Sequence, residues 1–228
     1  MHVIITGTSR GIGYEVLRRF VEENNHRIIA LSRNTASLDI FKNHPFVRYF
    51  PFDIMEREDH KKLMKEINTF FDNTVDILIN NAGVLINKPI AGLNPLDYDK
   101  MFNTHVKGVF FLIQKVLPSL TSGSHIVNIG SMGGYQGSKK FAGLSLYAAS
   151  KGALSILTEC LAEELKPNKI NVNMLSLGAV ETEMLQEAFP GSVNGMDVKE
   201  LSVFIKDFAQ KGQHLFNGKN IPVASTTP

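Results

Sequence analysis

Residues 6–13 read TGTSRGIG and join a short apolar run, HVIIT at 2–6, to a segment with apolar residues at helical spacing, GYEVLRRFVEEN at 13–24. Gly7, Gly11 and Gly13 allow a tight turn from a strand into a helix. In such a turn the backbone can approach a pyrophosphate, and the helix amino terminus adds free N–H groups. The stretch therefore predicts a dinucleotide site in a first βα unit, although an ordinary strand-to-helix turn is the alternative.

Strand and helix patterns alternate along the rest of the chain, and the strands are apolar throughout. This pattern predicts an α/β fold, a doubly wound, Rossmann-like parallel sheet of about seven strands with helices on both faces, forming a three-layer sandwich. We expect one domain, 1–228, with a small substrate loop at about 185–197. Further strands are expected at 27–31, 46–50, 75–80, 125–130, 170–177 and 220–224, and further helices at 57–71, 98–117, 146–165 and 198–210.

Composition excludes several classes of function. The 24 basic and 22 acidic residues give a net charge of +2 without long basic runs, so we expect no nucleic-acid partner. The longest apolar run, GVFFLIQKVL at 108–117, is too short for a membrane span, and we expect none. The seven histidines lack metal-ligand spacing, which predicts no metal site. The single cysteine, Cys160, and the lack of a secretory leader predict a cytoplasmic protein.

The residues after the second predicted strand bear on cofactor preference. An NAD-binding protein usually places an acid there to accept hydrogen bonds from the ribose 2′-hydroxyl, but this chain has LSRN at 31–34. Ser32 and Arg33 replace the acid, and Arg10 adds a cation within the glycine turn. Guanidinium groups pair well with a 2′-phosphate, so NADP(H) is predicted over NAD(H), which stays possible. The alternative is that both arginines are merely solvated.

The sequence YAASK at 147–151 places a phenol and an ammonium four residues apart in a predicted helix. Positions i and i+4 share a helix face, so Tyr147 and Lys151 can reach one point in space. A neighbouring cation lowers the pKa of a phenol, which would suit an acid and base. The alternative is a surface pair in which the lysine stem packs on the ring.

Together with the glycine turn, NNAG at 80–83, IGS ending at Ser131 and YAASK, the sequence resembles the short-chain dehydrogenase/reductase family, in its compact oxidoreductase branch. The resemblance implies that Tyr147 is the acid and base, that Lys151 binds the nicotinamide ribose and that Ser131 orients the substrate oxygen. It implies an NADP(H)-dependent oxidoreductase that interconverts a carbonyl and a secondary alcohol of a small molecule. A catalytically weak NADP(H)-binding sensor or scaffold protein of the same fold is the alternative.

The resemblance also implies the contacts to the cofactor. Asp53 matches a residue beside the adenine, and Thr182 matches the segment beside the nicotinamide and phosphates. Each has a structural alternative, since Asp53 and Thr182 can cap helices and Ser131 can belong to a turn. The predicted cofactor-binding residues are Gly7, Ser9, Arg10, Gly11, Ile12, Gly13, Ser32, Arg33, Asp53, Ile54, Asn81, Ala82, Gly83, Tyr147, Lys151, Gly178, Val180 and Thr182.

The chain departs from the family pattern at three places. His105 replaces an asparagine that supports a water linked to the active-site lysine, so His105 is a candidate for a proton path or a packed histidine. Leu177 replaces a proline before Gly178. The segment 132–146 is longer than is common and could bring Phe141, with Tyr135 and Gln136, to the substrate mouth; a surface loop is the alternative. In the family, the helices near Leu96 and Leu144 pair between subunits, so a homodimer or homotetramer is expected.

Overall fold

The computed structural model describes residues 1–191 and 195–224. A seven-stranded sheet with the order β3-β2-β1-β4-β5-β6-β7 organises the chain, and every neighbouring pair is parallel. The predicted doubly wound, Rossmann-like fold is thus confirmed. The strands are β1 (His2–Thr6), β2 (Arg27–Ser32), β3 (Val47–Pro51), β4 (Val75–Asn80), β5 (Leu120–Ser131), β6 (Asn171–Leu177) and β7 (Asn220–Val223).

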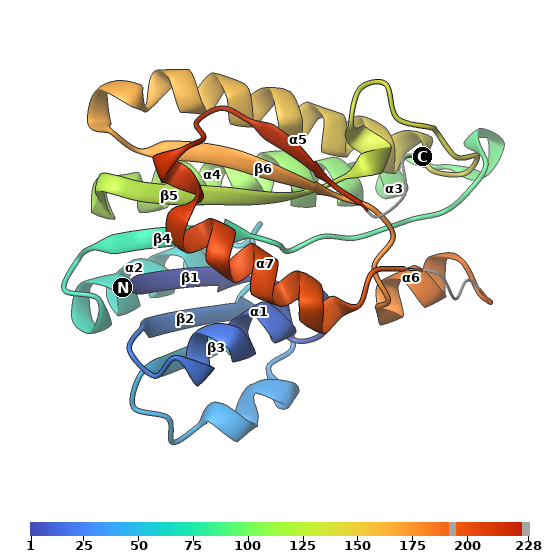
Figure 1. Ribbon diagram of the computed structural model, residues 1–228. Coiled ribbons are helices and arrows are strands. Elements are labelled where there is room, and N and C mark those ends of the chain that lie inside the picture. The colour runs from blue at the N-terminus through green and yellow to red at the C-terminus, as the bar shows by residue number, and fades with distance from the viewer. Residues whose placement is uncertain (192–194, 225–228) are drawn as a thin grey trace.

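Helices cover both faces of this sheet (Figure 1). On one face lie α1 (Gly11–Glu22) and α7 (Val198–Lys211), and on the other lie α2 (Arg57–Phe70), α4 (Gly108–Val116) and α5 (Ser145–Glu164). Two shorter helices, α3 (Pro95–Phe102) and α6 (Glu183–Ala188), flank the carboxyl ends of the strands. Short 3-10 helices are η1 (Ala36–Phe41), η2 (Ile90–Gly92), η4 (Leu117–Ser119), η5 (Met132–Gly134), η6 (Lys166–Asn168) and η7 (Gly212–His214).

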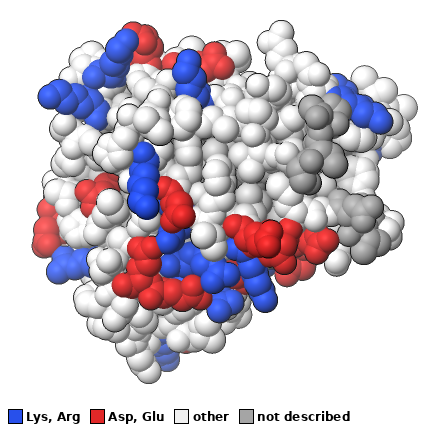
Figure 2. Space-filling view, in the orientation of Figure 1, with Lys and Arg blue, Asp and Glu red and all other residues white. Residues whose placement is uncertain are grey.

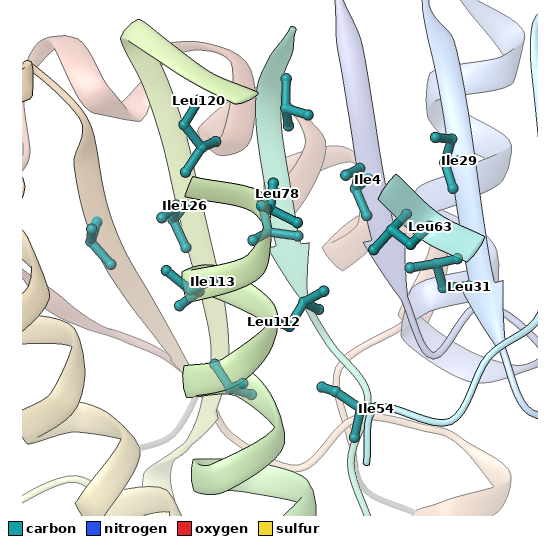
Figure 3. Close-up of a cluster of buried hydrophobic side chains, with 14 of the residues drawn as sticks. Ile4, Ile29, Leu31, Ile54, Leu63, Leu78, Leu112, Ile113, Leu120 and Ile126 are labelled. Carbon is teal, nitrogen blue, oxygen red and sulfur yellow. The ribbon is translucent and has the colours of Figure 1, made fainter. Parts of the chain in front are cut away.

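Strand periodicity divides the core into two layers. Ile4 faces α2 and α4, where it belongs to a cluster with Leu63 and Leu112 (Figure 3), whereas its neighbours Val3 and Ile5 face α1 and α7. All five of these side chains are fully buried. Because both faces of the central strands are covered, these strands are rich in apolar residues on both sides, as is typical of parallel sheets.

The surface charges of the α1 and α7 face are of mixed sign (Figure 2). Acidic and basic side chains lie side by side there and pair with each other, as Arg19 does with Glu22 and Lys206 with Glu23. No helix within 1–191 or 195–224 is long and apolar enough to cross a bilayer.

The helix predicted at 98–117 differs in one respect from a regular helix. It begins at Pro95, behind a capping box in which Asn94 accepts from Asp97, and it contains one π-helical turn, η3 (Asn103–Lys107), before α4 begins. There the N–H of Gly108 donates to the carbonyl of Asn103, five residues back. A π-turn inserts one extra residue into the helix and is frequent at functional sites.

The segment predicted as a substrate loop, 185–197, is only partly irregular. Its beginning forms α6, which Thr182 caps by accepting a hydrogen bond from the N–H of Leu185 at 3.3 Å. Residues 192–194 of this loop lie outside the described residues. After them, Met196 forms a parallel bridge with Val180, so both ends of the segment return to the carboxyl edge of the sheet.

Candidate active site

A cavity of about 1030 Å³ opens at the carboxyl ends of the strands, where the strand order reverses between β1 and β4. Open α/β sheets bind their ligands at such a switch point. The cavity walls include the glycine turn after β1, the end of β5 and the first turns of α5. Of the predicted catalytic and cofactor-binding residues, all line this cavity except Gly13.

The glycine turn is a tight loop whose glycine positions leave no room for a side chain. Gly7 and Gly11 have φ values of +73° and +58°, which favour glycine. A Cβ on Gly13 would lie 2.3 Å from the carbonyl oxygen of Gly7 and 2.4 Å from Nδ2 of Asn81. Gly13 therefore permits the close packing of α1 against the turn rather than touching the cavity.

The segment after β4 supports this turn. Asn81 donates from Nδ2 to the carbonyl oxygens of Thr6 and Gly7 at 3.0 and 3.1 Å, and the N–H of Ala82 donates to Oγ1 of Thr6 at 2.9 Å. Gly11 and Ile12 at the start of α1 line the cavity beside this turn. The residues present fit a dinucleotide, because the backbone of the turn is open to a pyrophosphate and rigidly held.

The two predicted cations differ in their surroundings. Arg33 is exposed after β2 and forms no ion pair with any described residue, whereas Arg10 forms a two-pronged pair with Glu187 of α6. The Nη1–Oε1 and Nη2–Oε2 distances are 2.5 and 3.2 Å. The hydrogen bond to Glu187 raises the pKa of Arg10, so Arg10 stays charged. The sequence gives no sign of this pair, since its members are 177 residues apart.

Tyr147, Lys151 and Ser131 all line the cavity, and a hydrogen bond joins Ser131 to Tyr147. Lys151 is buried, and its Nζ donates to the carbonyl oxygen of Ile129 at 2.9 Å. Burial lowers the pKa of Lys151 to about 8. Ser131 Oγ accepts from the N–H of Gly133 at 3.1 Å, so the serine also supports the turn that follows β5.

The protonation of Tyr147 differs from the sequence-based expectation. Burial raises the pKa of Tyr147 above its ordinary value of 10.0, and a hydrogen bond with Ser131 acts in the opposite direction. The Nζ of Lys151 donates to the strand carbonyl of Ile129. In the chain by itself, burial thus keeps Tyr147 as a neutral phenol.

His105 lies on the π-turn beside the ring of Tyr147, with ring centroids 5.7 Å apart and planes at 84°. Its Nε2 accepts from the N–H of Val84 at 3.0 Å, and its Nδ1 lies 2.8 Å from Oγ of Ser150. Burial, with a further contribution from the charge of Lys151, lowers the pKa of His105 well below its ordinary value.

Other predicted residues combine a cavity position with a local structural role. Asp53 lines the cavity while its Oδ1 accepts from the N–H of Met55 at 3.0 Å, within the turn before α2; the residue at the start of α2 is Glu56, so Asp53 is not its cap. Leu177, at the proline position, is buried opposite Val223 in the sheet, and the N–H of Gly178 donates to the Val223 carbonyl at 2.9 Å. Of the insertion residues, Phe141 lines the cavity, whereas Tyr135 and Gln136 do not.

The substrate side of the cavity is built from three segments that the sequence does not connect. Asn87 donates from Nδ2 to the carbonyl oxygen of Ala188 at 2.8 Å, which holds the end of α6. The N–H of Lys88 donates to the carbonyl oxygen of Gly143 at 3.0 Å, which holds the insertion after β5. The mouth is largely apolar, with Leu85, Phe141, Leu144, Met184, Leu185 and Phe189 among its lining residues.

Comparisons with known proteins agree with this geometry. A family model described as short chain dehydrogenase matches residues 1–192. An uncharacterized oxidoreductase from Staphylococcus aureus (strain MW2) is 26% identical over 204 residues, which cover 87% of this chain and 86% of that protein.

Solved structures share the fold. 4-Hydroxyisoleucine dehydrogenase complexed with NADH has a TM-score of 0.85 at 23% identity, covering 98% of this chain and 96% of that one. A short chain dehydrogenase from Burkholderia cenocepacia J2315 in complex with NADP has a TM-score of 0.83 at 24% identity, covering 97% and 95%.

Proposed function

Because the chain belongs to the short-chain dehydrogenase family of oxidoreductases, we propose that it interconverts a carbonyl and a secondary alcohol with NADP(H) as the cofactor. The observation that carries this proposal is the meeting of Ser131, Tyr147 and Lys151 in the same cavity as the glycine turn. A proton donor, a hydroxyl that can hold a substrate oxygen and a cation there lie within reach of one bound molecule.

The proposed chemistry assigns one task to each side chain. A bound nicotinamide would supply the hydride to the carbonyl carbon or accept it from the alcohol. In reduction, Tyr147 donates its phenolic proton to the carbonyl oxygen, while Ser131 donates a hydrogen bond to the same oxygen. The raised pKa of Tyr147 keeps the phenol protonated at neutral pH, which suits a proton donor. Lys151 would bind the nicotinamide ribose, and its pKa, lowered to about 8 by burial, lets it change its charge near neutrality.

The preference for NADP(H) rests on Arg33 and Arg10 at the adenosine end of the cavity. Arg33 is free of ion pairs within the described part of the chain and can bind a 2′-phosphate directly. Arg10 is held by Glu187, but the exposed fractions of the two side chains, 48% and 61%, place this pair in solvent, where ion pairs contribute only about 0.2–1 kcal/mol. A 2′-phosphate can therefore displace Glu187 at little cost. The similar structures include complexes with NADH and one with NADP, so the preference is argued from the chain's own residues.

A thermal-shift comparison tests this preference. We expect NADP⁺ to raise the melting temperature more than NAD⁺ at equal concentration, and Arg33→Ala to remove most of the difference. A larger shift with NAD⁺ would overturn the preference for NADP(H).

The substrate class follows from the apolar mouth, which favours a carbonyl compound with a hydrophobic substituent. A panel of aliphatic and aromatic ketones and aldehydes, followed by NADPH absorbance, tests the activity, with Tyr147→Phe as the control. Turnover by the parent that disappears in the variant is the expected result. If the variant turns over as fast as the parent, the assigned proton role fails. If NADPH binds and no compound reacts, the sensor or scaffold alternative replaces the enzyme.

The assembly proposed for the chain is a homodimer or homotetramer, and the proposed location is the cytoplasm. Exposed apolar side chains gather on α3, α4 and α5, where Leu96, Tyr98, Phe111 and Ile156 are between 46% and 77% exposed. Exposed groups of this size are typical of subunit interfaces. Light scattering at micromolar concentration should give at least twice the 25.3 kDa of one chain, and a monomer would contradict the proposal.

A further inference from the structure

We propose that His105 is a positioning residue with a fixed neutral tautomer, which braces the backbone of Tyr147 against the segment after β4 and does not carry protons. The inference rests on the proposed function, because it concerns the alignment of Tyr147 as the acid and base. Four observations carry it: the two hydrogen bonds of the imidazole, the link from Ser150 to Tyr147, and the packing of the ring.

The first hydrogen bond fixes the tautomer. The backbone N–H of Val84 can only donate, and it lies 3.0 Å from Nε2 of His105. Nε2 must therefore present its lone pair, and the ring proton must reside on Nδ1. A second proton on Nε2 would face the N–H of Val84 at hydrogen-bonding distance, so the charged imidazolium is incompatible with this arrangement.

The second hydrogen bond transmits the position of the ring to Tyr147. Ser150 is fully buried, and its hydroxyl donates to the carbonyl oxygen of Tyr147 at 2.8 Å. Since the single hydroxyl proton is used there, Oγ of Ser150 accepts the Nδ1–H of His105, 2.8 Å away. The bonds run in one direction, from Val84 through His105 and Ser150 to the backbone of Tyr147.

Packing restricts the ring further. His105 is 1% exposed and meets the ring of Tyr147 edge to face. On its other side a Cβ added to Gly83 would lie 3.3 Å from Nε2, so the backbone of the segment after β4 is in close contact with the imidazole. Lys151 is the charged group that acts on the ring, and together with burial it disfavours the imidazolium.

These contacts separate His105 from a proton path. Both ring nitrogens are already engaged, one with a backbone N–H and one with a serine that itself donates to a carbonyl. Passing a proton between His105 and Lys151 would break the contact with Val84 or Ser150 and release Tyr147. The side chain of His105 therefore holds Tyr147 in position and does not transfer a proton. We expect no titration of His105 in the pH range in which histidines usually titrate.

The first experiment measures the tautomer in the unaltered protein. NMR of the protein with ¹⁵N-labelled histidine rings resolves the seven histidines, and the signals absent in His105→Asn assign His105. We expect the neutral Nδ1–H tautomer with constant shifts from pH 5 to 8. An Nε2–H tautomer, or a titration midpoint within that range, overturns the inference, and neither result depends on catalytic activity.

The second experiment separates the two hydrogen bonds with a matched pair of variants. In His105→Asn the amide nitrogen occupies the δ position and can still donate to Ser150. In His105→Gln the amide oxygen occupies the ε position and can accept from Val84, but no donor remains for Ser150. Ser150→Ala removes the link itself. The matched control is Ser202→Ala on α7, because Ser202 is also buried, donates to the carbonyl three residues back at 2.7 Å and accepts from a side chain, Arg19, at 3.2 Å.

The readout is the kcat, the KM and the NADPH dissociation constant, with the panel compound that gives the largest Tyr147-dependent rate. We expect kcat to fall about tenfold to hundredfold in Ser150→Ala and His105→Gln, because a displacement of about 1 Å at a catalytic group has effects of this size. NADPH affinity should stay within about threefold, and His105→Asn should lose less kcat than His105→Gln, because it keeps the donor to Ser150 although it gives up the contact with Val84. Equal losses in His105→Asn and His105→Gln, or no loss in Ser150→Ala, refute the inference.

The two proposals fail in different ways. If Tyr147→Phe keeps the parental rate, the proposed function fails, while the NMR measurement still tests the tautomer of His105. If Tyr147→Phe is inactive and the kcat of Ser150→Ala equals that of Ser202→Ala, the proposed function is supported and the positioning role of His105 is refuted. Circular dichroism of each variant establishes that it is folded before its kinetics are compared.

Discussion

Replacing Lys151 with methionine should stabilise the protein at neutral pH while removing a group of the proposed catalytic site. Burial lowers the pKa of Lys151 from 10.5 to about 8, so the folded chain disfavours the ammonium that the unfolded chain accepts. This difference corresponds to a free-energy cost of about 3 kcal/mol at pH 7. Methionine has a similar length and no charge, and it forfeits the hydrogen bond to Ile129, worth about 1 kcal/mol. The variant should therefore be more stable by about 2 kcal/mol at pH 7.

The pH dependence of this gain identifies its cause. The folded-state pKa lies below the unfolded-state pKa, so between pH 8 and pH 10.5 the unfolded chain binds more protons than the folded chain. The cost is fully present below pH 8 and disappears as the pH rises through this window. At pH 9.5 it has fallen to about 1 kcal/mol, and the advantage of Lys151→Met over the parent should have vanished.

Urea unfolding followed by far-UV circular dichroism measures both quantities, since the chain has no tryptophan to serve as a fluorescence probe. Parent and variant are compared at pH 7, 8, 9 and 9.5. The other lysines and the tyrosines are common to both proteins, so their titration cancels in the difference. A variant that is less stable at pH 7, or a difference that stays constant up to pH 9.5, would refute the reasoning. Such a trade of stability for function is frequent at active sites.

Three further predictions follow from the site and the core. Gly13→Ala should weaken NADPH binding at least about tenfold in a fluorescence titration, because its Cβ would lie 2.3 Å from the Gly7 carbonyl oxygen. An unchanged dissociation constant would show that the close packing at Gly13 is not needed for cofactor binding. Glu187→Gln should free Arg10 and tighten NADPH binding by about twofold to fivefold, with a smaller effect on NADH; an equal effect on both cofactors would exclude a contact with the 2′-phosphate. Burial lowers the pKa of His125 from 6.5 to about 4, so between these values the unfolded chain binds more protons and stability falls as the pH falls. Urea unfolding should show a loss of stability of about 1 kcal/mol between pH 7.5 and pH 5.5, and His125→Gln should remove this loss. An identical pH dependence of stability in both proteins would contradict this prediction.

The fold could be predicted from local patterns because the central strands are buried on both sides. Largely apolar runs such as VDILIN, which forms β4 at Val75–Asn80, leave little choice of structure. The ends of elements were less accessible. β5 begins at Leu120 rather than at the predicted residue 125, because Leu120 already pairs with Val75 before an irregularity that leads to the pair of Ile77 and His125. There the hydroxyl of Ser124 donates to the Val75 carbonyl oxygen and accepts from the N–H of Thr121.

The composition of the site followed from motifs, but its electrostatics did not. Spacing on a helix places Tyr147 and Lys151 on one face, and they do line one cavity. Spacing cannot show that burial raises the pKa of the Tyr147 phenol, or that Nζ of Lys151 is directed at the carbonyl of Ile129. For the same reason the partners of His105, Val84 and Ser150, are invisible in the sequence: they lie 21 and 45 residues away.

The one extra residue in the π-turn at Asn103–Lys107 sets how far α4 is rotated about the helix axis relative to α3. Each residue of a regular helix advances by about 100° around the axis, so deleting one residue here would rotate α4 by that angle relative to α3. Leu112 of α4, which is fully buried, would then turn away from the core. The ring of His105 would lose its contact with the ring of Tyr147. This stretch should tolerate substitutions far better than a change of length, and an insertion–deletion scan along 95–116 should find its sharpest intolerance at the π-turn.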